Sequence, residues 1–454
     1  MSLLLFWPGF AMYDSVAQFA QTQSGEYTDW HPPTMARLWA VLDAAFGGGA
    51  GPMLAVQMVG YWLGLGLIAA ALARLERGVA AATVLAIGVW PPFLGWQTAV
   101  LKDAQMAGAM LAAVGLVAHW RLRERAVPRA AWAVAVVLLG YATLVRANAV
   151  FAIAPLAVML VPGWNAWRRI GVGLAATVAV LAASGPINHR LLGAEPTSVV
   201  RSQAIYDLAG IAARVPEAGD LPLNTERRRA LIAKRCVSPF FWDPLGSPDR
   251  CDAIVEPLRD LAVSTLYLDL ASAALRHPVA YLSHRLAHLN STDRWLVPVG
   301  WTSAAPPQFT QANDFKLGQP GAGARALQRL AGWLVETPPA WPIVWIAVAL
   351  VAVLVASRRA AAPTRDLALA LLVSALALEL SFAGLSIASD LRYHLWPMIA
   401  AALAVVLLGR PRDGERALLI RGAVLVAMVA ASGILARIVL PPAPSSYEAM
   451  LAGR

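Results

Sequence analysis

"YTDWHPPTMARLW", residues Tyr27 to Trp39, interrupts a chain that otherwise reads as a series of apolar helices. The stretch holds an aspartate, a histidine and a double proline within a few residues. Charged and helix-breaking residues are costly inside a bilayer and ordinary outside it. The side of a membrane on which this stretch lies therefore decides how the rest of the chain is arranged.

The composition indicates a membrane protein with several spans. Of the 454 residues, 58% are apolar and only 14% are charged, and the mean hydropathy is +0.58. Soluble domains carry about 25% charged residues. The formal net charge of +10 does not indicate nucleic-acid binding, because the arginines occur as short clusters between apolar runs and form no continuous basic patch.

The hydropathy pattern predicts an all-α polytopic fold with about 11 transmembrane helices. A crossing needs about 20 residues. Ten segments are predicted to span: 52–72, 79–95, 102–120, 129–145, 149–162, 169–186, 341–357, 366–388, 393–409 and 421–440. Residues 3–12 are too short and contain Pro8, so we expect them to be the outer end of a first helix whose start is missing.

Arginine-rich connectors alternate with connectors that are nearly free of arginine, and this alternation predicts the orientation. The basic set is Arg74 and Arg77; Arg121, Arg123, Arg125 and Arg129; Arg168 and Arg169; Arg358, Arg359 and Arg365; and Arg410, Arg412, Arg416 and Arg421. These connectors all fall on one side, which we predict to be the cytoplasm of a bacterium. The first loop (13–52) and the polar stretch 187–340 then lie outside the inner membrane.

Three domains follow from this topology. Residues 1–186 form an N-terminal transmembrane module, residues 187–340 a mainly helical extracytoplasmic domain, and residues 341–454 the C-terminal transmembrane helices. Cys236 and Cys251 both fall in the outside domain, where an oxidising compartment favours a disulfide over two free thiols.

The first outer loop is predicted to contain two helices on the membrane surface. Asp14 opens an amphipathic stretch, the double proline ends any helix before it, and a second helix follows at 34–46. This arrangement leaves Asp14, Asp29 and His31 at the boundary of water and lipid. The alternative is that Asp14 caps a helix and Asp29 is an ordinary loop acid.

Two further clusters lie at the outer ends of predicted spans. Lys102 and Asp103 begin one span, and their alternative roles are an interfacial lysine and a helix N-terminal charge. Arg146 and Asn148 lie in a very tight outer turn. A lone arginine there departs from the charge rule, which favours a functional anion as its partner.

A fourth cluster surrounds the sequence "SDLRYHLWP". Arg392 and Tyr393 lie at the outer mouth of a late span, beside Asp390 and His394. Glu379 precedes Asp390 by 11 residues within the preceding span, so it is a candidate functional acid or a buried structural one. His284 and His288 are four residues apart, but without a third ligand an amphipathic surface is the preferred interpretation.

All four clusters are predicted to lie on the outer face. The acids that could act as a base are then on the same side as the cations that could hold a phosphate, namely Lys102, Arg146 and Arg392. Helix caps and interfacial anchors would be spread over both faces, so the coincidence favours one shared extracytoplasmic site.

Three motifs carry a resemblance to a known superfamily. They are "YDS" at 13–15, "HPP" at 31–33 and "RYHLWPMIAAAL" at 392–403. In this order they resemble the polytopic GT-C glycosyltransferases, in the branch of protein mannosyltransferases and aminoarabinose transferases. That branch has a first-loop aspartate, a "KPP"-type turn and a late "RYxLPxxPAL" element. His31 stands where the branch often has lysine, and residues 187–340 have no match.

The resemblance implies transfer of a sugar from a polyprenyl-phosphate donor lipid to a glycan, lipid or protein acceptor outside the cytoplasm. It gives Asp14 the role of catalytic base, or of a ligand of a divalent cation as in some members, and it implies no other cofactor. Asp103 or Asp29 would orient the acceptor, with His31, Asn148 and Glu379 as further candidates. The predicted donor-phosphate ligands are Lys102, Arg146, Arg392 and Tyr393.

Two other classes of function remain as alternatives. A secondary transporter predicts inverted repeats and charges near the bilayer midplane, whereas the charges here lie at helix ends, Glu379 excepted. A non-catalytic envelope-assembly protein would depend on the outside domain instead. The sequence leaves open which sugar, which acceptor and which prenyl length are used, as well as metal dependence and oligomeric state.

Overall fold

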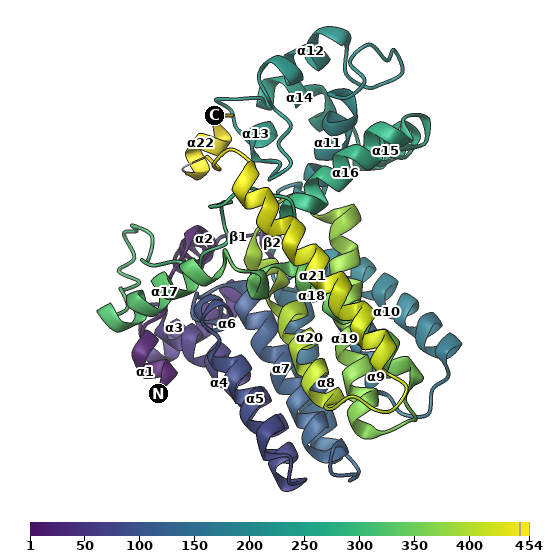
Figure 1. Cartoon of the computed structure of the whole chain (residues 1–454). Helices are drawn as coiled ribbons and strands as arrows, with labels where there is room; N and C mark the ends of the chain where they lie inside the picture. Colours follow the sequence, from purple (N-terminus) through teal and green to yellow (C-terminus); the bar gives the residue numbers. More distant parts are fainter. Residues whose placement is uncertain (445, 454) are drawn as a thin grey trace. The chain divides into compact units, whose positions relative to one another are not determined.

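A computed structural model of the chain describes residues 1–444 and 446–453, and Figure 1 shows its elements in chain order. These residues fold into two compact units. Unit 1 comprises Met1–Pro196, Ala305–Glu379 and Arg392–Ala430, and unit 2 comprises Thr197–Ala304, Leu380–Leu391 and Ala431–Arg454. The three domains expected from the sequence were defined by their position relative to a bilayer, which the two units do not report. That division therefore stays a prediction.

Unit 1 is built almost entirely of helices. Its N-terminal elements are α1 (Ser2–Phe6), α2 (Tyr13–Ser24), β1 (Tyr27–Thr28), α3 (Thr34–Phe46), α4 (Gly51–Arg74), α5 (Gly78–Val89), α6 (Pro91–Gln97), α7 (Lys102–Arg121), α8 (Arg129–Val145), η1 (Ala147–Ala149), α9 (Val150–Leu160), α10 (Ala166–Pro186), η2 (Ile187–Leu191) and β2 (Ala194–Glu195). Its later elements are α17 (Ala322–Leu334), η3 (Pro338–Ala340), α18 (Pro342–Arg358), α19 (Pro363–Leu385), η4 (Leu391–His394), α20 (Leu395–Leu408) and α21 (Arg416–Val439), of which α19, η4 and α21 run across the division between the units.

All ten predicted membrane segments are helical, which confirms an all-α, multi-pass membrane protein. Among the described residues, five helices are long and apolar enough to cross a bilayer: 51–74, 166–191, 363–385, 391–408 and 416–439. The segment predicted at 79–95 is bent by 57° between α5 and α6. The bend falls at Pro91 and Pro92, because a proline removes a helical hydrogen bond.

Close packing of α4 against α7 forms the centre of unit 1. Gly60 and Gly64 are four residues apart on α4, a spacing that lets two helix backbones approach in a membrane. A Cβ at Gly64 would lie 2.2 Å from the backbone of Leu111, and one at Gly115 would lie 2.6 Å from the carbonyl oxygen of Gly64. The contact therefore depends on glycine on both helices.

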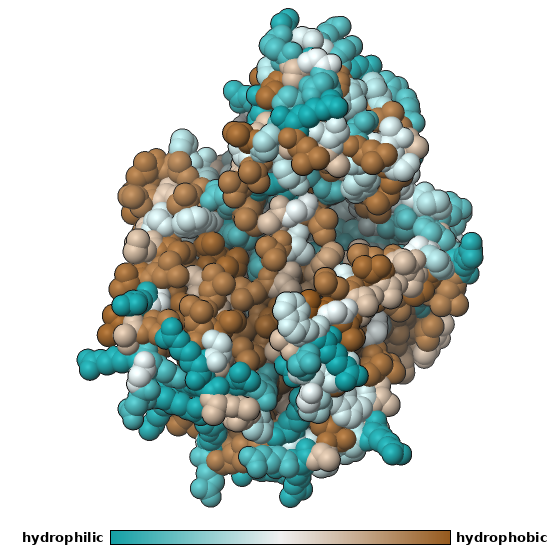
Figure 2. Space-filling model, turned by 90° about the vertical axis from the view of Figure 1, so that its right-hand side faces the viewer, coloured by the Kyte–Doolittle hydropathy of each residue, from teal (hydrophilic) through white to brown (hydrophobic). Residues whose placement is uncertain are grey.

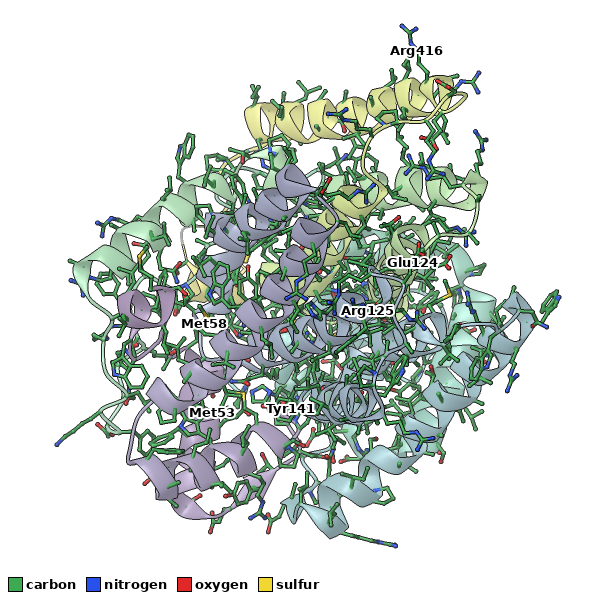
Figure 3. All side chains as sticks on the ribbon, turned by 90° about the horizontal axis from the view of Figure 1, so that it is seen from below. Met53, Met58, Glu124, Arg125, Tyr141 and Arg416 are labelled. Atoms are coloured by element: carbon green, nitrogen blue, oxygen red, sulfur yellow. A yellow bond between two sulfur atoms is a disulfide. The ribbon has the colours of Figure 1, made fainter. Side chains whose placement is uncertain are left out.

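The arginine-rich connectors lie at one end of the helices of unit 1. Over this unit, Figure 2 shows brown apolar side chains along the helices and teal side chains gathered at their lower end. The view from below labels Glu124, Arg125 and Arg416, which belong to two of these connectors (Figure 3). The arrangement agrees with the predicted basic face, and its assignment to the cytoplasm stays a prediction.

The loop predicted to lie outside (13–52) has the expected form of helix, turn and helix. The helix α2 ends at Gly25, whose φ of 75° is a conformation that glycine adopts without strain, and α3 begins immediately after the double proline. Phe19 of α2 packs against Trp39 of α3, with ring centroids 5.1 Å apart. Between the helices, β1 pairs in parallel with β2, a contact that the sequence pattern did not predict.

Unit 2 consists of short helices around a core of its own. They are α11 (Val199–Ala212), α12 (Thr225–Ala233), α13 (Asp243–Gly246), α14 (Asp252–Arg259), α15 (Val263–Arg276), α16 (Pro278–Thr292) and α22 (Tyr447–Leu451). Cys236 and Cys251 are both buried in this core and form a disulfide. In the chain-entropy description, closing a loop of 15 residues stabilises the fold by about 3 kcal/mol.

Candidate active site

The first turns of α2 and α7 lie side by side because the residues before them pair in parallel. The pairing joins Phe10 with Ala99, and the N–H of Val100 donates to the carbonyl of Phe10 at 2.8 Å. The hydroxyl of Ser15 then donates to the carbonyl of Val100 at 2.6 Å. A Cβ at Gly9 would lie 2.8 Å from a Val100 methyl group, so the close approach favours glycine there. The charged residues on the two first turns are thereby brought together.

The carboxylate of Asp14 has three cationic or hydrogen-donating neighbours. Its Oδ2 lies 3.0 Å from Nη2 of Arg392 and 3.6 Å from Nζ of Lys102, and its Oδ1 lies 3.6 Å from Nε2 of His31. Asp14 is not the helix cap, since the cap position is Met12, whose N–H donates to Oγ of Ser15 at 3.0 Å. The side chain of Asp14 is only 15% exposed, so these contacts are shielded from water.

A second buried carboxylate, Asp103, adjoins the first. It accepts a hydrogen bond from Nη1 of Arg146, and its Oδ2 lies 3.7 Å from Nε of Arg392. Arg392 therefore lies between Asp14 and Asp103, which are carried by different helices. All of the distances in this cluster join groups of unit 1.

Tyr393 and Asn148 orient the two guanidinium groups. The Tyr393 ring centroid is 4.3 Å from Cζ of Arg146 and 5.5 Å from Cζ of Arg392, within the range of cation–π attraction. Nε of Arg146 also donates to Oδ1 of Asn148 at 2.7 Å. Asn148, two residues after Arg146 in the tight turn that follows α8, thus holds the Arg146 side chain in place.

Charge and burial determine the protonation of the cluster. Burial raises the pKa of the Asp14 carboxyl, but the charges of Arg392 and Lys102 together outweigh it and hold this pKa well below its ordinary value. Burial lowers the pKa of His31, and the nearby Lys102 ammonium lowers it further. His31 is therefore neutral at pH 7, and three cationic side chains face two carboxylates.

The hydrogen bond between Lys102 and His31 fixes the histidine tautomer. An ammonium has only donors, so Lys102 donates to Nδ1 of His31. The ring proton of the neutral imidazole then lies on Nε2, which faces Asp14. His31 can thus donate to the carboxylate without carrying a charge.

Two predicted site residues have other contacts. The carboxylate of Asp29 lies 3.6 Å from Nε2 of His189, close to the pairing of β1 with β2. Glu379 is buried, and its carboxylate lies 2.8 Å from Nδ1 of His394. Their suggested roles toward an acceptor stay predictions.

The histidine pair of unit 2 has structural partners. Nε2 of His284 lies 3.2 Å from the buried carboxylate of Asp207, and Nδ1 of His288 lies 2.7 Å from the carbonyl oxygen of Pro239. Both histidines are buried, so they do not lie on the amphipathic surface that the sequence led us to expect, and their partners are those of a folded interior.

The sequence patterns missed Gln18 as a neighbour of the site. Gln18 lies one turn after Asp14 and is 1% exposed, and its Nε2 is 3.4 Å from the carbonyl oxygen of Asp14. Its buried Oε1 has no hydrogen-bond partner within the part of the chain that the structure describes. The spacing of four residues from Asp14 was the signal available.

The environment of Asp14 does not favour a divalent cation. Such an ion would have to bind beside Lys102 and Arg392, whose positive charges already neutralise the carboxylate. The donor set therefore fits an anionic ligand better than a metal ion.

Comparisons with known proteins return a fold likeness only. No protein-family model matches the chain, and no curated protein matches it either. Among solved structures, ArnT from Cupriavidus metallidurans bound to undecaprenyl phosphate is 16% identical, with a TM-score of 0.30 over 88% of this chain and 75% of that chain. The apo structure of the same ArnT is 17% identical, with a TM-score of 0.29 over 91% of this chain and 76% of that one.

ArnT is a GT-C aminoarabinose transferase, so these structures come from the superfamily that the sequence motifs resemble. TM-scores near 0.3 describe a loose likeness, and they transfer neither a function nor a residue role to this chain.

Proposed function

We propose that the protein is a membrane glycosyltransferase that moves a sugar from a polyprenyl-phosphate carrier to an acceptor on the extracytoplasmic side. The observation that carries this proposal is the contact of Asp14 with Arg392 and Lys102. Two candidate phosphate ligands, which come from distant parts of the chain, each lie within 4 Å of the candidate base.

Asp14 acts as the base in this proposal. It accepts the proton of the acceptor hydroxyl as that oxygen forms a bond to the anomeric carbon of the sugar. The bond between the anomeric carbon and the phosphate oxygen breaks at the same time, and its electron pair leaves with the polyprenyl phosphate. The products are the glycosylated acceptor and the carrier phosphate.

The cations stabilise the departing phosphate. Arg392 and Arg146 offer planar, always charged donor groups, and Lys102 offers a compact ammonium. Asp103 contacts both arginines, so we assign it to holding them in place rather than to the acceptor. Tyr393 limits the motion of the same two guanidinium groups through its ring.

The basic connectors support an outer location of the site. The acidic and basic cluster lies at the starts of α2 and α7, whereas the exposed arginines Arg74 and Arg77 follow the opposite end of α4. By the positive-inside rule the cluster faces away from the cytoplasm. A lipid-linked donor of the outer leaflet would then reach it.

Asp14→Asn is the direct test of the proposed base. We expect sugar transfer from polyprenyl-phosphate-linked donor lipids to fall by about 100-fold or more, because general base catalysis contributes at least that much. The matched control is Asp43→Asn on α3, whose carboxylate accepts only from exposed Gln23 among the contacts recorded for it. Expression and the melting temperature of both variants are measured alongside.

The outcomes separate the proposal from its rivals. Undiminished transfer in Asp14→Asn removes Asp14 as the base, and undiminished transfer in Asp103→Asn as well removes the site. Uptake of a labelled solute into vesicles, unchanged by either substitution, would favour a transporter.

The phosphate-binding half has its own test. Undecaprenyl phosphate should bind the purified protein in detergent, and Arg392→Gln should weaken this binding about tenfold or more, since a charge-assisted hydrogen bond is worth about 1.5–3 kcal/mol. Arg229→Gln, at an exposed pair with Glu217, should leave it unchanged.

A further inference from the structure

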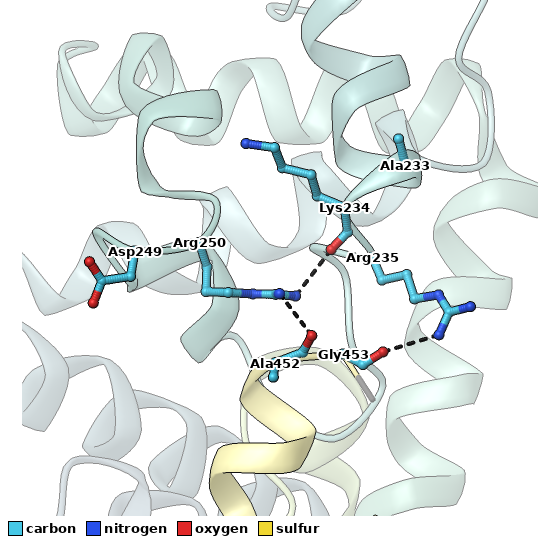
Figure 4. A pocket seen from close by; sticks show the side chains of 7 residues that line it. All are labelled: Ala233, Lys234, Arg235, Asp249, Arg250, Ala452 and Gly453. Carbon is cyan, nitrogen blue, oxygen red and sulfur yellow. Dashed lines mark hydrogen bonds between the residues drawn. The ribbon is translucent and has the colours of Figure 1, made fainter.

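A pocket of about 410 Å³ lies beside the disulfide of unit 2 (Figure 4). Its charged lining consists of Lys234, Arg235, Arg250 and Asp249, and the backbone of Ala452 and Gly453 completes it. Arg235 and Arg250 each directly precede one of the two bridged cysteines.

The disulfide holds the two arginines near each other. The Cα atoms of Cys236 and Cys251 are 5.9 Å apart, which limits the separation of the residues before them. Nη2 of Arg250 donates to the carbonyl of Lys234 at 3.1 Å and so fixes the neighbouring peptide. Arg235 has a φ of 50°, the left-handed conformation that ends α12, where the N–H of Cys236 donates to the carbonyl of Leu231 at 2.9 Å.

The donors of the pocket are incompletely used. Nη1 of Arg250 donates to the carbonyl of Ala452 at 2.8 Å, and Nη1 of Arg235 donates to that of Gly453 at 3.1 Å. Nε of Arg250 is buried and has no hydrogen-bond partner among the described residues. A guanidinium group has five N–H donors, so Arg235 and Arg250 keep further donors for a ligand that enters the pocket.

The charge of the pocket is positive. Lys234 is exposed, and its ammonium makes no hydrogen bond or ion pair to any residue that the structure describes. The carboxylate of Asp249 points away from both guanidinium groups (Figure 4). The lining of the pocket thus carries three cationic side chains and one carboxylate.

We propose that this pocket binds a phosphate group, carried either by a soluble phosphate or by an anionic lipid headgroup. A phosphate offers several strongly accepting oxygens and up to two negative charges, which match the one lysine and two arginines of the lining. A carboxylate would offer two oxygens in one plane and one charge. The proposal is independent of the glycosyltransferase function, because its residues lie in unit 2 and contact no group of the Asp14 cluster in the recorded interactions.

The small number of lysines gives a direct readout. The chain has three, Lys102, Lys234 and Lys316, of which Lys234 and Lys316 are exposed. The full-length protein in detergent is acylated with an amine-reactive ester, and each lysine peptide is quantified by mass spectrometry. Inorganic phosphate at ten times its dissociation constant should slow acylation of Lys234 about tenfold, by simple mass action, and leave Lys316 unchanged.

Variants and controls decide the result. Arg250→Gln and Arg235→Gln should each abolish the protection of Lys234, and so should reduction of the disulfide. Retention of the disulfide and an unchanged acylation rate of Lys316 show that each substituted protein is folded. Potassium chloride at equal ionic strength is the control for general screening.

A second arm distinguishes the source of the phosphate. The protein is placed in nanodiscs of phosphatidylglycerol or of phosphatidylcholine, and acylation of Lys234 is measured again. Protection by phosphatidylglycerol alone identifies a lipid headgroup, and protection by inorganic phosphate alone identifies a soluble ligand. Equal slowing of Lys234 and Lys316, protection that survives Arg250→Gln, or no protection in either arm overturns the proposal.

Discussion

At the residue scale, the central feature is a carboxylate whose cationic neighbours are also the proposed phosphate ligands. Arg392 contacts both Asp14 and Asp103. A donor phosphate that attracts the Arg392 guanidinium group would therefore weaken the ion pair between Arg392 and Asp14. The same movement would make Asp14 a stronger base, because burial alone raises the pKa of its carboxyl. In the proposed reaction, donor binding and activation of the base would thus be coupled through one guanidinium group.

The coupling predicts a shift in the pH dependence of the reaction. Because the pKa of Asp14 is held well below its ordinary value, the base stays ionised at mildly acid pH, and the acid limb of kcat/KM lies below the usual carboxyl range. Arg392→Gln removes the strongest lowering charge, so the limb should move to higher pH while the maximal rate falls. A pH profile of both proteins measures this, and Arg229→Gln should leave the limb in place.

The lowered pKa of Asp14 also determines how its contribution to stability depends on pH. A carboxyl whose folded pKa is lowered contributes stability above its unfolded pKa of about 3.9, and this contribution is lost as the pH falls through the folded value. An unmoved acid limb in Arg392→Gln would mean that Asp14 is not the group that titrates.

The buried pair of Asp103 and Arg146 makes a separate prediction for stability. Arg146→Gln leaves the carboxylate of Asp103, which is 1% exposed, with Arg392 as its remaining charged neighbour. We expect the free energy of unfolding to fall by about 3 kcal/mol, as when one partner of a buried ion pair is removed. Reversible unfolding in mixed micelles measures it.

A double substitution checks that the loss comes from the pair. Asp103→Asn combined with Arg146→Gln should recover part of the stability, because the buried carboxylate is then neutral. The exposed Arg229→Gln should change stability by less than about 1 kcal/mol. A loss in the double variant equal to the sum of the single losses would count against the pair.

At the element scale, the sequence predicted the helices well and their contacts incompletely. Apolar periodicity located all ten membrane segments, and the double proline with Thr34 gave the bounds of α3. The pairing of β1 with β2 was missed because two residues per strand leave no alternation to detect. The bend at Pro91 was missed because apolar residues continue on both sides of it.

The packing of α4 on α7 can be tested at one glycine. In Gly64→Ala the added methyl group would meet the backbone of Leu111 at 2.2 Å, so the two helices must separate. We expect a loss of about 1–3 kcal/mol in the free energy of unfolding, typical of overpacking. Gly66→Ala, on the same helix with nothing within 4 Å of the new Cβ, is the matched control.

The two glycine variants should differ clearly. Gly66→Ala should be neutral or slightly stabilising, since alanine favours the helix. Equal melting temperatures for both variants would show that the close approach at Gly64 is not needed for the fold.

At the scale of the whole molecule, the sequence predicted that the site residues lie on one face of the membrane. It did not predict which of them contact one another. The arginine alternation grouped Asp14, Lys102, Arg146 and Arg392 on one side of the membrane. It gave no reason for Arg392 to contact Asp14 and Asp103, because that contact depends on the approach of α2 to α7 and on the turn at η4. Long-range contacts of this kind leave no local pattern in the sequence.

The predicted topology can be tested with single cysteines. The two native cysteines are joined in a disulfide, so a thiol reagent reports only on an introduced residue. Glu26→Cys, after α2, and Glu124→Cys, after α7, both replace exposed side chains. We expect a membrane-impermeant maleimide to label Glu26→Cys in intact cells, and Glu124→Cys only after permeabilisation, because the arginines around Glu124 favour the cytoplasm.

The proposed reaction depends on this result more than on any single contact. A donor lipid in the outer leaflet reaches Asp14 only if α2 faces outward, and Glu26 lies just beyond the end of that helix. A further pair, Glu76→Cys after α4 and Ser24→Cys at the end of α2, should repeat the contrast at independent positions. Labelling of Glu26→Cys and Glu124→Cys from the same side would remove the argument for an extracytoplasmic site, even if Asp14 and Arg392 remained in contact.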